Sequence, residues 1–158
     1  MRIAFFTETF LPNTDGVVNT LCHLLDYLGE RGHESLMFAP GNEPSAYAQT
    51  PVIRMGGYAL PLYPEIRLVR PTVNVTSDLA GFEPDIVHVA SPFALGVAGL
   101  RSARRLGLAV VASFHTDVSG FGGRAGVGGA RRAPWAPLRR LHNNTCLRLW
   151  PAPRTRPT

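Results

Sequence analysis

MRIAFFTETFLPNTDGVVNTLCHLLDYLGERG, residues 1–32, has the pattern of a strand, a loop and a helix in direct succession. The apolar run at 3–6 is short and β-prone, which is typical of a parallel strand covered on both faces. A polar loop with one proline and Gly16 follows. Apolar residues then recur at helical spacing from Val17 to Leu28, and Gly29 and Gly32 are typical stop signals for a helix.

The loop between this strand and this helix is the first candidate for a functional site. In an open α/β sheet, ligands bind beside the carboxyl ends of the strands, where the next helix begins. The first turn of that helix presents free N–H groups and the positive end of the helix dipole to anions. If the protein has a ligand site, we expect this loop to be part of it.

Further along the chain, apolar runs predict buried strands at 33–39, 86–90 and 108–114. Residues 51–55 can form a short additional strand, whereas 56–70 show no clean period and are interpreted as an excursion over the sheet edge.

A helix is predicted at 94–105, with Ser91 as N-cap and Pro92 as the first helical residue, and a weaker helical pattern covers 72–82. This alternation indicates an α/β fold with a doubly wound, mostly parallel, Rossmann-like sheet in a single domain. We expect strands near 2–6, 34–39, 86–90 and 109–114 to be parallel neighbours.

Length and composition favour a globular protein. The 158 residues are enough for one domain with a sizeable core, and 45% of them are hydrophobic. No run approaches the ~18 apolar residues of a membrane span, and the start lacks the features of a signal peptide, so we expect a cytoplasmic protein. Cys22 and Cys146 are expected to be free thiols, because neither lies in a metal or disulfide pattern.

Charge is distributed unevenly along the chain. Residues 1–100 contain 5 arginines against 10 acidic residues, and 101–158 contain 11 arginines against Asp117 alone, which gives −5 and +10. Residues 118–133 also contain six glycines and no acidic residue. For this basic part we favour a solvated or poorly folded segment, then contact with an anionic membrane surface, and we expect no nucleic-acid partner.

Several common site motifs are missing from the sequence. The GxGxxG fingerprint of nicotinamide and flavin enzymes, the Walker loop and the GxSxG elbow do not occur, and no cofactor or metal is expected. Gly16 by itself is better explained as a turn glycine that starts a helix than as a ligand site. His115 directly follows a strand, so it is either a ligand for a sugar hydroxyl or phosphate or a loop histidine satisfied by backbone, and His88 is expected in the core.

Four blocks carry a resemblance to a known family: MRIAFFTETFLPNTDGVVNTL, EPDIVHVASPFALGVAG, RRLGLAVVASFHTD and LHNNTCLRLWPAPRTR. Together they resemble the N-terminal domain of retaining glycosyltransferases of the family-four type, which have the two-domain GT-B fold. Within that group the sequence is most similar to enzymes that transfer mannose or glucose from a nucleotide sugar to a lipid or glycan acceptor. The resemblance assigns 1–117 to this domain and 118–158 to a glycine- and arginine-rich continuation of it.

The resemblance also implies roles for individual residues. The loop glycine of the family, whose backbone faces the diphosphate of the donor, matches Gly16, and Val17 begins the helix behind it. The histidine that lies against the transferred sugar matches His115, the expected catalytic residue. The remaining expected substrate contacts are Thr116 and Asp117 in the same motif, Glu8 on the acceptor side of the first loop, and Asn13.

Activity of the chain alone is not expected, because the second domain of the family supplies most contacts to the nucleotide sugar. The protein would then be an inactive remnant or half of a split enzyme, with peripheral contact to the inner face of the membrane. A noncatalytic α/β module that binds a phosphorylated small molecule or an anionic lipid surface is the alternative.

Overall fold

A computed structural model describes residues 1–41, 43–60, 63–70, 74–91, 93–113 and 147–149. Its main feature is a seven-stranded sheet in the order β3-β4-β2-β1-β7-β8-β9, and β5 and β6 form a separate two-stranded sheet. The strands are β1 Arg2–Phe6, β2 Glu34–Pro40, β3 Ala46–Tyr47, β4 Thr50–Met55, β5 Gly57–Leu60, β6 Tyr63–Val69, β7 Ile86–Val89, β8 Ala109–Ser113 and β9 Leu147–Leu149. The helices are α1 Gly16–Glu30, α2 Thr76–Phe82 and α3 Ala94–Arg105.

The predicted parallel sheet is confirmed. Strand β1 pairs in parallel with β2 on one side and with β7 on the other, and β7 pairs in parallel with β8. Strand β4 extends the sheet in parallel beside β2, β9 does so beside β8, and only the short β3 runs antiparallel to its neighbour β4.

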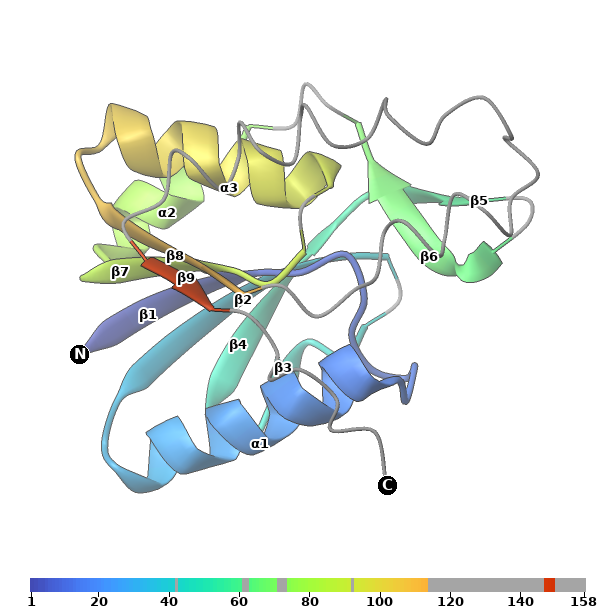
Figure 1. Ribbon diagram of the computed structural model, residues 1–158, viewed down its shortest axis with the longest axis horizontal. Coiled ribbons are helices and arrows are strands. Elements are labelled where there is room, and N and C mark those ends of the chain that lie inside the picture. The colour runs from blue at the N-terminus through green and yellow to red at the C-terminus, as the bar shows by residue number, and fades with distance from the viewer. Residues whose placement is uncertain (42, 61–62, 71–73, 92, 114–146, 150–158) are drawn as a thin grey trace, which may run out of the picture.

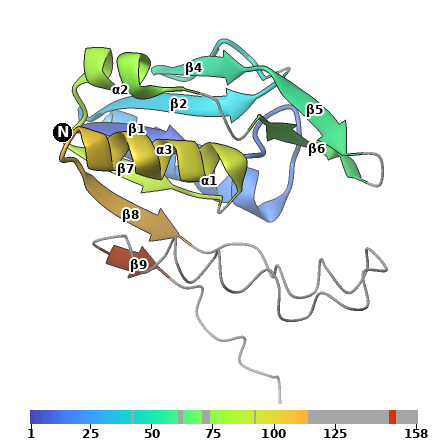
Figure 2. The ribbon, with the colours of Figure 1, turned by 90° about the horizontal axis from the view of Figure 1, so that it is seen from above.

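Helices cover both faces of the sheet: α1 lies on one face, and α2 and α3 lie on the other (Figures 1 and 2). The side chains of β1 alternate accordingly, since Phe6 belongs to the core under α2 and α3 and Phe5 to the core under α1. Both rings are fully buried. Burial on both faces explains why this strand is apolar throughout instead of alternating.

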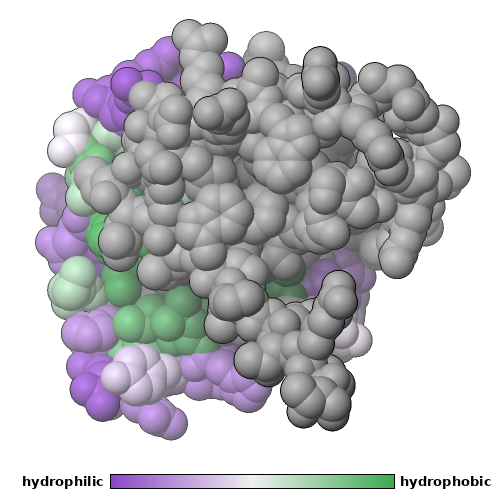
Figure 3. All heavy atoms as spheres, viewed as in Figure 1, coloured by the Kyte–Doolittle hydropathy of each residue, from purple (hydrophilic) through white to green (hydrophobic). Residues whose placement is uncertain are grey.

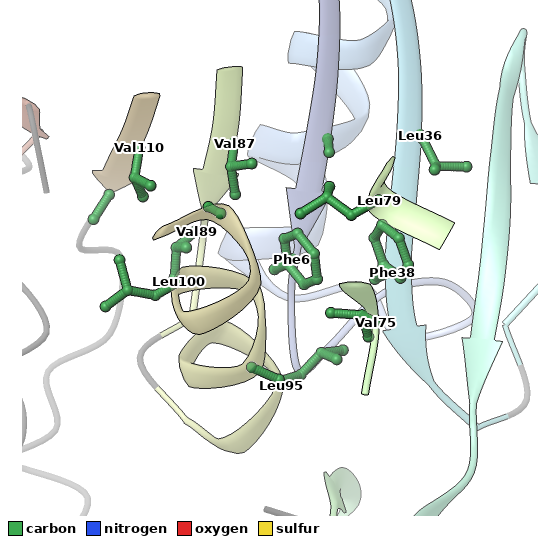
Figure 4. Close-up of a cluster of buried hydrophobic side chains, with 14 of the residues drawn as sticks. Phe6, Leu36, Phe38, Val75, Leu79, Val87, Val89, Leu95, Leu100 and Val110 are labelled. Carbon is green, nitrogen blue, oxygen red and sulfur yellow. The ribbon is translucent and has the colours of Figure 1, made fainter. Parts of the chain in front are cut away.

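The core between the sheet and α3 is built around two stacked rings, Phe6 and Phe38, whose centroids are 4.5 Å apart and whose planes differ by 2° (Figure 4). Gly99 of α3 lies directly against the first of them, because a Cβ there would be 2.6 Å from Cγ of Phe6. Glycine at this position lets the helix approach the sheet closely.

Three details differ from the expectations. Residues 57–60 and 63–69 are not an irregular excursion but form the antiparallel strands β5 and β6, which project beside the main sheet (Figure 1). Helix α2 is shorter than the pattern at 72–82 and begins at Thr76. The N-cap of α3 is Phe93 and not Ser91, and Phe93 makes no capping bond with its side chain.

Apolar and polar residues are separated on the surface of the described residues. In the space-filling view, apolar residues of the described chain gather between polar upper and lower margins (Figure 3). None of the helices in the described ranges is long and apolar enough to cross a membrane.

Candidate functional site

The candidate site lies at the carboxyl ends of β1 and β7, where the N-termini of α1 and α3 also meet the sheet. The β1–α1 loop, residues 7–15, follows β1 directly. Its backbone is tied to the sheet on both sides of β1: Thr7 N–H donates to the carbonyl of Phe38 at 3.2 Å, and Ala90 N–H, just after β7, donates to the carbonyl of Phe6 at 2.9 Å. The loop therefore starts from a fixed position.

The end of this loop is organised by Asp15, the N-cap of α1. One carboxylate oxygen accepts from Val18 N–H at 2.8 Å, and the other accepts from the hydroxyl of Thr9 at 3.1 Å. The amide of Asn13 donates in turn to the Thr9 hydroxyl at 3.4 Å. Capping satisfies one of the free N–H groups of the helix and holds the loop against its first turn.

Gly16, the first residue of α1, has open space beside it: among the described residues, no heavy atom beyond its chain neighbours and its own helix backbone lies within 4 Å of the position that its Cβ would occupy. Its φ is not positive, unlike those of Gly32, Gly41 and Gly107. Neither the backbone conformation nor the packing of the described residues therefore requires a glycine here. This position therefore has open space beside it in the first turn of α1, where Asp15 caps the N–H of Val18.

Glu8 is the most unusual residue of the loop, because its side chain is buried with an exposed fraction of 2%. Its Oε1 accepts from Leu95 N–H of α3 at 2.5 Å, and its Oε2 is buried without a hydrogen-bond partner among the described residues. Burial raises the pKa of this carboxyl to about 7, although the N–H groups of Leu95 and Gly96 partly oppose the rise. The side chain faces the protein interior, although the sequence predicts a contact with the acceptor.

Ser91, which follows β7, connects the two loops of the site. Its hydroxyl accepts from Glu8 N–H at 3.2 Å and lies 3.5 Å from the hydroxyl of Thr7. Gly96 packs on the same segment so closely that a Cβ would lie against the carbonyl oxygen of Ser91. The sequence suggested Ser91 only as a helix cap, and nothing in the local pattern indicated its contact with the first loop.

At the neighbouring strand end, the Nε2 of His88 lies 2.8 Å from the hydroxyl of Ser113, the last residue of β8. His88 is buried and its ring packs on Phe5 with 5.1 Å between centroids, as expected of a core residue. The predicted residues His115, Thr116 and Asp117 come just after Ser113 and lie outside the described residues.

The described residues thus bring together four of the predicted positions: Glu8, Asn13, Gly16 and Val17 all lie in the β1–α1 loop or in the first turn that follows it. In the described part of the chain, no group of three or more histidine, cysteine or acidic residues is arranged to hold a metal ion. The site consists of backbone amides, hydroxyls, the side-chain amide of Asn13, the carboxylate of Asp15 and the buried carboxyl of Glu8.

A comparison of the sequence with models of known protein families assigns the chain to a family. The family model of Glycosyltransferase Family 4 matches residues 14–152, which includes α1, α3 and every strand from β2 onward. The chain belongs to this family. The resemblance carried by the four sequence blocks and the Rossmann-like fold of the N-terminal half are thereby confirmed.

Similar proteins in this family include two described as GDP-mannose-dependent alpha-mannosyltransferases. The protein from Mycolicibacterium smegmatis is 40% identical over 96% of this chain and 42% of its own length, and that from Mycobacterium tuberculosis is 39% identical over 90% and 39%. An alpha-monoglucosyldiacylglycerol synthase from Acholeplasma laidlawii is 29% identical over 77% of this chain and 31% of its own length. The chain spans about two fifths of the length of the mannosyltransferases.

Proposed function

We propose that this chain forms the N-terminal side of a retaining hexosyltransferase that transfers mannose from GDP-mannose to a lipid or glycan acceptor. In this proposal the N–H groups of Gly16 and Val17 face the diphosphate of the donor. The activity of the relatives at 39% and 40% identity supports mannose over glucose. The open space beside Gly16, in the first turn of α1, is the observation that carries the proposal.

The fold of the described residues does not require a glycine at position 16. Glycine in a helix costs up to about 1 kcal/mol relative to alanine. At Gly99 a close ring contact explains such a cost, whereas at Gly16 there is only open space. A glycine beside an open helix N-terminus allows a ligand to approach the backbone, and phosphate groups bind at such positions through N–H groups and the helix dipole.

The N–H groups at the start of α1 suit the negative charge that develops on the diphosphate during the reaction. When the bond between sugar and diphosphate breaks, negative charge grows on the leaving diphosphate, and fixed N–H donors stabilise that charge without having to reorganise. His115, with Thr116 and Asp117, is proposed to contact the transferred sugar. Contacts to the nucleotide base are assigned to the second domain that the family resemblance implies.

A matched pair of glycine variants tests the proposal. Gly16 and Gly29 lie at opposite ends of α1, and at neither would an added Cβ meet a heavy atom within 4 Å. We expect Gly16→Ala to weaken binding of GDP or GDP-mannose by about tenfold, the equivalent of about 1.4 kcal/mol, and Gly29→Ala to leave it unchanged. Isothermal titration calorimetry measures both. Equal affinities of the Gly16→Ala variant and the parent chain would refute the assignment.

We also propose that the protein is cytoplasmic and makes peripheral contact with an anionic membrane. The net charge of residues 101–158, with 11 arginines and one acidic residue, supports it. Co-sedimentation with vesicles that contain anionic lipid, but not with vesicles of neutral lipid alone, is the expected result. Equal recovery with both kinds of vesicle would argue against the contact.

A further inference from the structure

Glu8 links two parts of the site that are 87 residues apart in the sequence. Its carboxylate accepts from Leu95 N–H in the first turn of α3, and its own N–H donates to the hydroxyl of Ser91 in the β7–α3 connection. The side chain and the backbone of one residue therefore both hold the β1–α1 loop against the start of α3.

Helix α3 needs a capping group from elsewhere in the chain. Its N-cap residue, Phe93, provides no side-chain acceptor, so the N–H groups of the first turn lack a local partner. A carboxylate is the strongest acceptor for such groups, because its charge also interacts favourably with the helix dipole. Glu8 supplies this group from the neighbouring loop.

We propose that Glu8 is a positioning residue: by capping α3 from the β1–α1 loop, its carboxyl group holds the N-termini of α1 and α3 in a fixed relation. Asp15 is the last residue of the same loop, and Gly16 directly follows it as the first residue of α1. The inference goes beyond the proposed function, and only its consequence for the diphosphate rests on that function. Both helices then carry an internal carboxylate at the N-terminus, Glu8 at Leu95 of α3 and Asp15 at Val18 of α1.

The groups around Glu8 determine how this link responds to pH. Desolvation dominates, and Leu95 and Gly96 contribute through their backbone N–H groups. The hydroxyl of Ser91 accepts from Glu8 N–H and lies 3.5 Å from the hydroxyl of Thr7, and no charged side chain of the described residues contributes to the pKa shift of Glu8. The carboxyl accordingly changes its protonation state near neutral pH, and the charge that caps α3 changes with it.

Nuclear magnetic resonance of the full chain tests the link without any ligand. In ¹H–¹⁵N spectra we expect the amide resonances of Leu95 and Gly96 to shift with pH around a common midpoint near 7, as the pKa of Glu8 implies. Glu8→Gln keeps the acceptor oxygen but cannot ionise, so it abolishes this titration.

Glu43→Gln is the matched control, because Glu43 is also a buried glutamate whose Oε2 has no hydrogen-bond partner among the described residues and whose pKa is raised by burial. This variant should leave the midpoint at Leu95 and Gly96 unchanged. The proposal is overturned if these two amides do not titrate, or if they titrate equally in Glu8→Gln.

A second measurement separates the link from the proposed function. We expect Glu8→Ala to lower the affinity for GDP by about tenfold, the equivalent of about 1.4 kcal/mol, through displacement of the loop, and Glu8→Gln to restore most of it. If the parent chain does not bind GDP, the proposed function fails while the amide titration still decides on the link. If GDP binds equally to the parent and to Glu8→Ala, the positioning role is refuted.

Discussion

Gly99→Ala is expected to destabilise the protein although alanine is the better helix former. The added Cβ would lie 2.6, 2.7 and 2.8 Å from three ring atoms of Phe6. That ring has no exposed surface and is stacked on Phe38 at 4.5 Å, so it cannot move without disturbing a second buried ring. Helix and strand must therefore separate, or both rings must leave their preferred positions.

The magnitude follows from two opposing effects. Overpacking of a well-packed core costs about 1–3 kcal/mol, and the contact here involves a rigid ring, which favours the upper part of that range. Replacing glycine by alanine within a helix returns about 1 kcal/mol. We therefore expect the free energy of unfolding to fall by about 1–2 kcal/mol, with a decrease in Tm of about 2–8 °C.

Urea denaturation of the full chain, followed by circular dichroism, measures this change. Gly29→Ala is the control, because a Cβ at Gly29 meets no heavy atom within 4 Å. It should be neutral or more stable than the parent by about 0.5 kcal/mol. If Gly99→Ala is as stable as Gly29→Ala, the close contact between α3 and the Phe6 ring of β1 is refuted.

Three further variants test the loop. Asp15→Ala removes the cap that accepts from Val18 N–H and should cost about 1 kcal/mol, whereas Asp15→Asn should cost clearly less; urea denaturation compares them. Ser91→Ala removes the acceptor for Glu8 N–H and should cost about 1–2 kcal/mol by the same assay, and no loss would contradict that contact. Burial raises the pKa of Glu8 from 4.5 to about 7, so its contribution to stability is fully present below pH 4.5 and is lost as the pH rises to about 7. The loss amounts to about 3 kcal/mol, and Glu8→Gln should remove this part of the pH dependence of unfolding, whereas an unchanged profile would contradict the raised pKa.

Much of the sheet could be predicted from the sequence because buried parallel strands have a strong local signal. The runs around Phe6, His88 and Val111 are uninterrupted, and each proved to be a central strand. The hairpin β5–β6 was missed because prolines at 61 and 64 interrupt its pattern. Its pairing of Tyr58 with Leu68 is defined by contacts across the hairpin and not by local periodicity.

In the candidate site, too, local sequence patterns predict single residues but not the contacts between distant segments. Gly16 and its loop could be located because the site edge of an α/β sheet follows from strand order. The role of Asp15 was also within reach, since aspartate directly before a helical pattern is a typical N-cap. The contact between Glu8 and Leu95 could not be predicted, because it joins the β1–α1 loop to the first turn of α3, and these meet only after β1 and β7 have paired.

The most direct test of the central claim is a titration of the full chain with GDP, followed by ¹H–¹⁵N spectra. We predict that, among the described residues, the largest shifts occur at the amides of Gly16 and Val17, in the first turn of α1 where the space beside Gly16 is open. The amides of Leu95 and Gly96 should shift less, because Glu8 already caps α3. Larger shifts at Leu95 and Gly96 than at Gly16 and Val17, or saturation without any change at Gly16, would contradict the central claim.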